Sequence, residues 1–120
     1  TMASKKGPKS PHSNKELADV DGRELDAWVA QEIDGYNGVS RRPDGDYDGN
    51  KGGMRLVPNY RNPSAVKTLA GNVLTSGRRL VLNDSGKGFL DIDSASEDEC
   101  ALANKVLVLE SMFKRGAVTQ

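Results

Sequence analysis

The chain has 120 residues, of which 28% are charged and 36% hydrophobic, and its 17 basic and 17 acidic residues give a net charge of zero. This length suits one small domain with a modest core. The balanced charge argues against a nucleic-acid binder, because such proteins usually carry a basic excess. The single cysteine, Cys100, excludes an intramolecular disulfide and fits a reducing compartment. No apolar run reaches the roughly 18 residues that a membrane span needs, so we expect a cytoplasmic protein.

The N-terminal segment, residues 1–20, is rich in Lys, Ser, Pro and Asn and has no apolar run. Such a segment buries too little surface to offset the entropy cost of ordering it. Four lysines precede the first acidic residue, Glu16. We therefore expect a flexible basic tail that keeps the chain soluble or weakly attracts an anionic partner. The folded domain is expected over residues 21–116, with a second short tail at 117–120.

Helical periodicity predicts a first helix over residues 22–33. Asp21 is its expected N-cap, and Glu24 stands at the spacing of a capping-box glutamate. Gly35 is the expected stop signal. Trp28 lies on the apolar stripe of this helix, so we expect it to be a core residue rather than a platform for a ligand.

Residues 35–53 are rich in glycine and aspartate and show neither strand nor helix periodicity, which predicts a long loop. Within this loop, residues 44–49, from Asp44 to Gly49, spell D-x-D-x-D-G, the first half of a calcium-binding loop. The bidentate acid that such a loop needs at its twelfth position is Arg55 here. An acidic, solvated loop is therefore the better interpretation, with calcium binding by Asp44–Asp48 as the alternative, and no metal site is included among the predicted site residues.

A short strand over residues 54–57 leads through a proline-containing turn to a second helix over 63–75. Asn62 is the predicted N-cap, and Pro63 takes the first helical position, where its missing N–H costs nothing. The predicted buried stripe of this helix comprises Val66, Leu69, Ala70 and Val73.

Two apolar segments, 79–83 and 88–92, are joined by a short glycine-containing loop and predict an antiparallel hairpin. A capping box of Ser96 and Glu99 begins a third helix over 97–114. The predicted buried stripe of this last helix comprises Leu102, Val106, Leu109 and Phe113. The fold class is thus α/β (α+β): a single-domain sandwich in the order α-β-α-β-β-α, with a mostly antiparallel three-stranded sheet packed by helices.

Three groups of residues make the chain resemble a family of small bacteriophage accessory proteins of unknown function, the phage ABA-sandwich domain type. They are residues 25–30 (LDAWVA), residues 57–60 (VPNY) followed by 62–65 (NPSA), and the last helix, entered through Ser96. The resemblance covers about residues 21–115. It implies an α/β sandwich and a phage accessory role, and it implies no reaction.

The sequence offers no set of catalytic residues. Its only histidine, His12, lies in the predicted tail, where nothing would hold it in catalytic geometry. No Cys/His group has zinc spacing, and no phosphate-binding loop stands between a strand and a helix. Cys100 has acidic neighbours that disfavour its thiolate. We therefore predict a protein that is not an enzyme and that needs no cofactor.

One cluster of polar residues is a candidate binding site, because it stands at the N-terminus of the second predicted helix. Free N–H groups and the helix dipole favour anions there. Tyr60 would stack on a base, and Arg61 would hold a phosphate. The alternative is that Asn62 and Ser64 only cap the helix while Tyr60 packs beside the turn. The full set of candidate ligand-binding residues is Tyr60, Arg61, Asn62, Ser64, Arg55, Arg78 and Arg79.

Together these features favour a non-enzymatic phage accessory protein that acts by binding in the host bacterial cytoplasm. The first hypothesis is counter-defence, in which the protein sequesters a nucleotide immune signal or blocks a host defence protein. The alternative is a protein–protein interaction or small structural module of the phage with no small-molecule ligand. A homo-oligomer stays open as well, because a symmetric interface leaves no mark in a single sequence.

Overall fold

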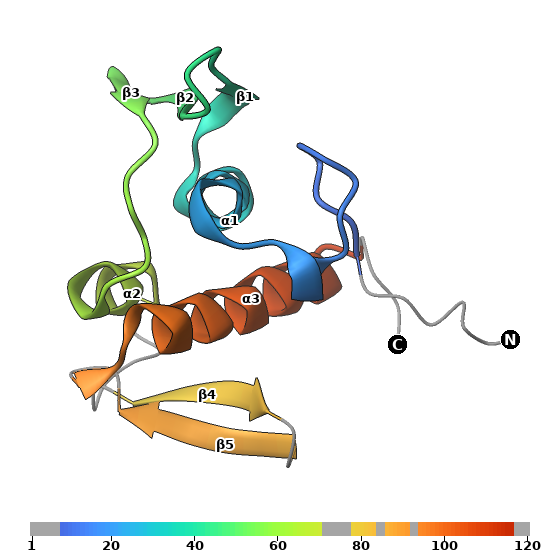
Figure 1. The fold of residues 1–120 in the computed structure, drawn as a ribbon, viewed down its shortest axis with the longest axis vertical. Coiled ribbons are helices and arrows are strands. Elements are labelled where there is room, and N and C mark those ends of the chain that lie inside the picture. Colours follow the sequence, from blue (N-terminus) through green and yellow to red (C-terminus); the bar gives the residue numbers. More distant parts are fainter. Residues whose placement is uncertain (1–7, 71–77, 84–85, 92–93, 117–120) are drawn as a thin grey trace, which may run out of the picture.

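The computed structural model describes residues 8–70, 78–83, 86–91 and 94–116. Its longest element is a C-terminal helix that runs across the middle of the molecule, between two other helices on one side and a β-hairpin on the other (Figure 1). These elements are α3 (Glu97–Lys114), the helices α1 (Gly22–Val29) and α2 (Pro63–Ala70), and the hairpin strands β4 (Arg78–Asn83) and β5 (Gly86–Asp91). None of the helices described is long and apolar enough to cross a membrane.

The predicted class is confirmed, since helices pack with a three-stranded antiparallel sheet. The strands of that sheet, in spatial order, are β1 (Asn37–Arg41), β2 (Tyr47–Lys51) and β3 (Met54–Leu56). The predicted strand at 54–57 is therefore present, but it pairs with β2 and not with the hairpin. β4 and β5 pair antiparallel with each other, as predicted, in a separate two-stranded sheet.

The prediction of a long loop over residues 35–53 was wrong, because most of this segment forms β1 and β2. Tyr47 is buried and Val39 is half-buried, while most other positions of the two strands are polar residues or glycine. An alternating apolar pattern is therefore missing. Gly49 also hides the strand in the sequence, because the fold needs a glycine there: a Cβ at this position would lie 3.0 Å from Cγ2 of Val39. Close packing at this position needs a glycine, which reads in the sequence as a loop residue.

The first helix begins as predicted at Gly22 and continues from Ala30 to Asp34 as a π-helical turn. It ends at Gly35, which has a φ of 88°, so the predicted glycine stop is confirmed. The predicted capping box is wrong: the Asp21 side chain makes no capping hydrogen bond, and the Glu24 carboxylate instead accepts a hydrogen bond from the Ser13 hydroxyl. Trp28 is buried in the core, as predicted.

The folded region begins before residue 21, contrary to the prediction of a tail over residues 1–20. Residues 17–19 form a short 3-10 helix, and both Leu17 and Val20 lie in the hydrophobic core. Lys105 of α3 donates a hydrogen bond of 2.8 Å to the carbonyl oxygen of Ala18. These two core side chains and this hydrogen bond tie the segment to the fold, although it shows no extended apolar run. Residues 1–7 and 117–120 lie outside the described residues.

Both predicted helix caps in the second half of the chain are confirmed. The Asn62 side-chain oxygen accepts a hydrogen bond of 2.9 Å from the Ala65 N–H at the start of α2. Ser96 and Glu99 form a reciprocal capping box at the start of α3, with bonds of 3.2 and 2.9 Å. The last residues of the second predicted helix, 71–75, lie outside the described residues.

The predicted buried stripe of α3 was wrong at its two ends, because Leu102 and Phe113 are 41% and 37% exposed. The helix contacts α1 and α2 on one side and β4 on another, so its buried surface is set by both neighbours. The residues that α3 buries are Cys100, Ala103, Asn104, Val106, Leu107, Val108 and Met112.

Candidate functional site

The predicted binding cluster lies in the turn that connects β3 to α2, residues 57–62, which is linked by hydrogen bonds to α1 and α3. This placement decides what each predicted residue does, because the turn buries Val57 and Tyr60 against the helices and leaves Pro58, Asn59 and Asn62 exposed. The side chains of Tyr60 and Arg61, which are neighbours in the turn, bind different carboxylates of the first helix.

Tyr60 is a buried residue with 3% of its surface exposed. Its hydroxyl donates a hydrogen bond to the Asp34 carboxylate, which also forms an ion pair with Lys51 at 2.7 Å. Burial, followed by the hydrogen bond to Asp34, raises the pKa of Tyr60 far above its ordinary value. The ring has no free face on which a base could stack, so the predicted stacking role of Tyr60 is not supported by its position.

Arg61 is also occupied within the protein. Its Nε lies 3.3 Å from both carboxylate oxygens of Asp26, and its Nη1 lies 3.3 Å from a carboxylate oxygen of Glu97. Only 16% of the Arg61 side chain is exposed. A guanidinium held by two carboxylates already has its charge balanced, so it offers little to a phosphate.

The centre of this arrangement is the carboxylate of Asp26, which is fully buried. It accepts hydrogen bonds from Nη1 of Arg23 at 2.8 Å and from the Tyr60 N–H at 3.2 Å, in addition to those from Arg61. Burial raises the pKa of the Asp26 carboxyl, and the two arginines and the Tyr60 N–H oppose that shift. Every close partner is a donor, so the carboxylate ties the turn to α1.

Arg23 extends this network to the sheet. Its guanidinium binds Asp46 at 2.7 Å and donates to the carbonyl oxygens of Val57 and Pro58. From the other side, Nδ2 of Asn104 in α3 donates to the Tyr60 carbonyl oxygen at 2.9 Å. We refer to Arg23, Asp26, Asp46, Tyr60, Arg61 and Asn104 as the turn network.

The turn network was missed by sequence reasoning, although one signal was present. Asp26 interrupts the apolar run at residues 25–30, and Arg23 stands three residues before it, at the spacing of an ion pair on one helix face. A charged residue in the middle of an apolar stripe is almost always paired when it is buried. The network is therefore a structural cross-link between α1, the sheet, the turn and α3.

A small pocket lies beside the turn at the N-terminus of α2 and has a volume of about 280 Å³. It is lined by Asp34, Pro58, Tyr60, Asn62, Ser64, Ala65 and Leu69. Three of the predicted site residues therefore share one pocket. Its single charged lining residue among those described is Asp34, and a paired carboxylate does not attract an anion. Among the side chains that the structure describes, none lines this pocket with the positive charge that a nucleotide phosphate needs.

Among the remaining predicted residues, Arg55 lies apart from this pocket. Arg55 is exposed on β3, where it lines a separate shallow pocket on the sheet with Asn37, Ser40, Asp48 and Asn50. Arg78 and Arg79 begin β4, and the structure does not describe their side chains. Of the candidate residues whose side chains are described, Tyr60, Asn62 and Ser64 share one pocket, and Arg55 and Arg61 do not line it.

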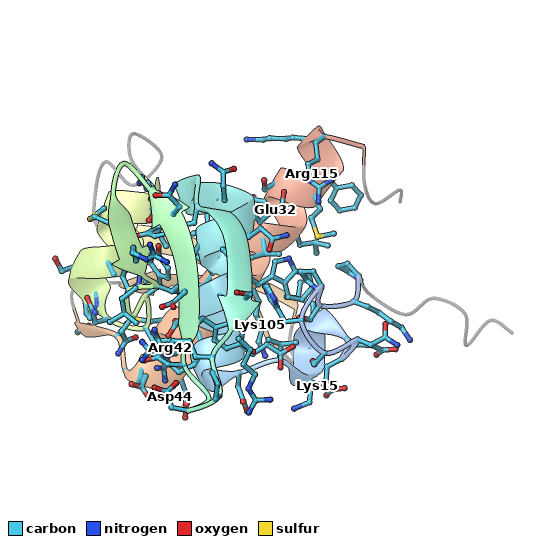
Figure 2. All side chains as sticks on the ribbon, turned by 90° about the horizontal axis from the view of Figure 1, so that it is seen from above. Lys15, Glu32, Arg42, Asp44, Lys105 and Arg115 are labelled. Atoms are coloured by element: carbon cyan, nitrogen blue, oxygen red, sulfur yellow. The ribbon has the colours of Figure 1, made fainter. Side chains whose placement is uncertain are left out.

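The acidic segment at residues 44–48 directs its carboxylates to arginines and not to a common centre. Asp44 and Asp48 lie 3.1 and 3.6 Å from the guanidinium of Arg42, and the first of these pairs is seen in Figure 2. Asp46 belongs to the turn network, and its hydrogen bond from Arg23 lowers the pKa of the Asp46 carboxyl. Among the residues that the structure describes, no group of three or more His, Cys, Asp or Glu side chains is placed to hold a metal ion.

Two residues with reactive side chains are placed inside the fold. Cys100 is buried, and burial, followed by Glu99 and Glu97, raises the pKa of its thiol, which disfavours the thiolate. His12 packs edge-on against Tyr47 with ring centroids 5.3 Å apart, and desolvation lowers the pKa of its imidazole. The raised pKa means that the Cys100 thiol is not activated as a nucleophile, and the lowered pKa favours the neutral form of the His12 imidazole.

Comparison of the chain with protein-family profiles, curated proteins and solved structures finds no match. The resemblance to small phage proteins therefore stays a prediction from residues 25–30, 57–60 and 62–65 and from the helix that Ser96 begins.

Proposed function

We propose that this protein is a non-enzymatic phage accessory protein that acts in the host cytoplasm by binding another protein, and that it blocks a host defence protein. The observation that carries the proposal is the exposure of two large apolar side chains, Met54 and Leu56, on the edge strand β3. They are 55% and 53% exposed, and they belong to one three-residue strand. Exposed apolar residues at a sheet edge are a liability unless a partner covers them.

The protein-blocking form of counter-defence is favoured over capture of a nucleotide signal. The stacking ring and the phosphate-binding arginine of the nucleotide hypothesis are Tyr60 and Arg61. The first is buried and the second is paired with Asp26 and Glu97. A nucleotide would have to break these contacts before it gained any of its own.

A second candidate function is a small structural module of the phage. It is favoured by an apolar groove of about 330 Å³ between the N-terminal segment and α3. The groove is lined by Pro8, Leu17, Ala18, Leu102, Lys105, Val106 and Leu109. A subunit that meets several neighbours would use more than one such surface.

Plaque assays on bacteria that carry individual defence systems test the proposal. The wild-type protein is expected to restore phage plating against one of those systems, and a Met54→Ser/Leu56→Ser variant is expected to lose this effect. The matched control is Leu102→Ser/Phe113→Ser, which removes the exposed apolar residues of α3 instead. If only the control variant loses protection, the binding surface lies on α3 and not on β3.

Calorimetry against cyclic and linear nucleotides tests the less favoured hypothesis, in which the protein captures a nucleotide signal. We expect no binding heat from any nucleotide of the panel. A binding heat that Arg61→Ala abolishes would show that the nucleotide hypothesis is right and that blocking of a protein is not needed. If the wild-type protein restores plating against none of the defence systems, the structural module becomes the better hypothesis.

A further inference from the structure

The strand β3 has one edge that no other strand covers. It pairs with β2 on one side, and in the described part of the chain no strand pairs with its other side. Figure 1 shows β3 at the periphery of the molecule, away from α3 and the hairpin. The Val57 N–H donates to the Tyr47 carbonyl oxygen of β2 at 3.2 Å. Because successive residues of a strand direct their N–H and C=O groups to opposite edges, those of Leu56 face the open side.

The open edge has a simple chemistry: one cation between two apolar side chains. Arg55 is exposed and forms no ion pair with any of the described residues, whereas Met54 and Leu56 are more than half exposed. Asp48 lines the same shallow pocket as Arg55, but its carboxylate lies 3.6 Å from Arg42. A partner strand would therefore meet an unneutralised positive charge.

This charge decides which kind of strand fits. Two copies of β3 that paired antiparallel about Arg55 would place two arginines directly opposite each other, which is destabilising. A second copy of this chain in that register is thus a poor occupant. A different chain with an acidic residue at that position gains an opposite-charge pair, and apolar neighbours of this residue cover Met54 and Leu56 on the other face.

We propose that β3 receives an extended segment of a partner protein as an added strand, and that this segment carries an acidic residue opposite Arg55 between two apolar residues. Main-chain hydrogen bonds then supply general affinity, and the alternating side chains supply specificity. The inference deepens the proposed function, since it rests on the same protein-binding edge and names the chemistry of the partner.

The other edge of the sheet, β1, is less suited to receive a strand. Gly38 in β1 has a φ of 64°, and the register with β2 shifts between Asn37 and Ser40. A positive φ and a bulge turn backbone groups away from the regular ladder. The exposed residues of β1 are also polar or glycine, so an apolar partner gains nothing there.

Backbone amide shifts in NMR spectra of the full chain test the inference. The probes are blocked seven-residue peptides, Val-Thr-Val-Xaa-Val-Thr-Val, in which the central residue is Glu, Gln or Lys. We expect shifts at Met54, Arg55 and Leu56, with affinity in the order Glu, Gln, Lys. The Glu peptide should bind roughly 3- to 30-fold more tightly than the Lys peptide, the range expected when an opposite-charge cross-strand pair replaces a like-charge one.

Two charge-reversed variants sharpen the test. Arg55→Glu should reverse the order, so that the Lys peptide binds best, and its amide spectrum reports whether the fold is intact. Arg41→Glu is the matched control, because Arg41 is an exposed arginine on the other edge strand, and it should leave the order unchanged. Shifts at residues 37–41, an order that Arg55→Glu does not reverse, or no shifts with any peptide would each overturn the inference.

Failure of the inference can be told apart from failure of the proposed function. If the wild-type protein restores phage plating and Arg55→Glu does so equally well, strand addition at β3 is wrong while the function stands. If plating is never restored but the peptides follow the expected order, the counter-defence function is wrong while the edge is still a strand-binding site. A wild-type dimer in sedimentation that Leu56→Lys dissociates would also overturn the inference, because a second copy would then occupy the edge.

Discussion

Removal of the Asp26 carboxylate should be among the most damaging single changes in this protein. Asp26→Ala takes away the acceptor for Nη1 of Arg23, for Nε of Arg61 and for the Tyr60 N–H. The carboxylate is fully buried, whereas the side chains of Arg23 and Arg61 are 28% and 16% exposed. Removal of one partner from a buried ion pair costs about 3–5 kcal/mol, because the remaining charge stays desolvated. The cost should lie at the lower end of that range, because both arginines keep a second carboxylate partner.

Neither arginine is left without an anion in the variant. Arg23 keeps Asp46 at 2.7 Å, and Arg61 keeps Glu97 at 3.3 Å. We therefore expect a loss of about 3 kcal/mol, a large share of the roughly 5–15 kcal/mol by which a domain of this size is usually stable. Asp26→Asn should lie between wild type and Asp26→Ala, because its amide keeps one acceptor oxygen but turns an NH₂ group toward one of the arginines.

Urea denaturation measures the effect. With a slope of about 1–3 kcal/mol per molar urea, Asp26→Ala should lower the midpoint by roughly 1–3 M. The control is Asp21→Ala, since Asp21 is exposed and its side chain makes no capping bond; its effect should stay within about 0.5 kcal/mol. An Asp26→Ala protein as stable as this control would refute the view that the turn network holds the fold together.

Three further predictions address other parts of the structure. Gly49→Ala should lower the free energy of unfolding by about 1–3 kcal/mol, because its Cβ would lie 3.0 Å from Cγ2 of Val39; an unchanged melting temperature would contradict the packing. Asn62→Ala should cost about 1 kcal/mol in urea denaturation through loss of the α2 cap, and a neutral result would contradict the cap. Hydrogen bonding to Arg115 lowers the pKa of Glu32 below 4.5. The folded state then binds the Glu32 proton less readily than the unfolded state, so Glu32 stabilises the fold above pH 4.5 and this contribution is lost as the pH falls through the lowered pKa. The stability difference between wild type and Glu32→Gln should therefore shrink from pH 7 to pH 3 in urea titrations, and a constant difference would refute it.

The pair behind the last prediction also shows how distant segments meet. Glu32 lies in the turn after α1 and Arg115 follows α3, yet Nη2 of Arg115 lies 2.7 Å from a Glu32 carboxylate oxygen (Figure 2). The Ser111 hydroxyl donates to the same carboxylate at 3.0 Å. Nothing in the sequence around Glu32 indicates this contact, because its partners stand about 80 residues away.

Features that depend on neighbouring residues were predictable from the sequence. The capping box of Ser96 and Glu99 placed the start of α3, and Asn62 before Pro63 placed the start of α2. Gly35 placed the end of the first helix, and two short apolar segments predicted the β4–β5 hairpin. Caps, stops and turns satisfy backbone groups a few residues away, so they can be recognised from the spacing of neighbouring residues.

Features that depend on contacts with distant parts of the chain were decided only in the tertiary structure. Leu102 and Phe113 fit a helical stripe, but α3 packs on two sides and leaves both of them exposed. Tyr60 and Arg61 stand at a helix N-terminus like ligand-binding residues, yet Asp34 and Asp26 reach them from the end and the middle of the first helix. A side chain's free energy depends on which groups surround it in space, and those groups come from parts of the chain that no local pattern connects. Within the described part of the chain, the same packing leaves Arg55 without a carboxylate partner, and for this reason we propose the edge of β3 as the recognition surface.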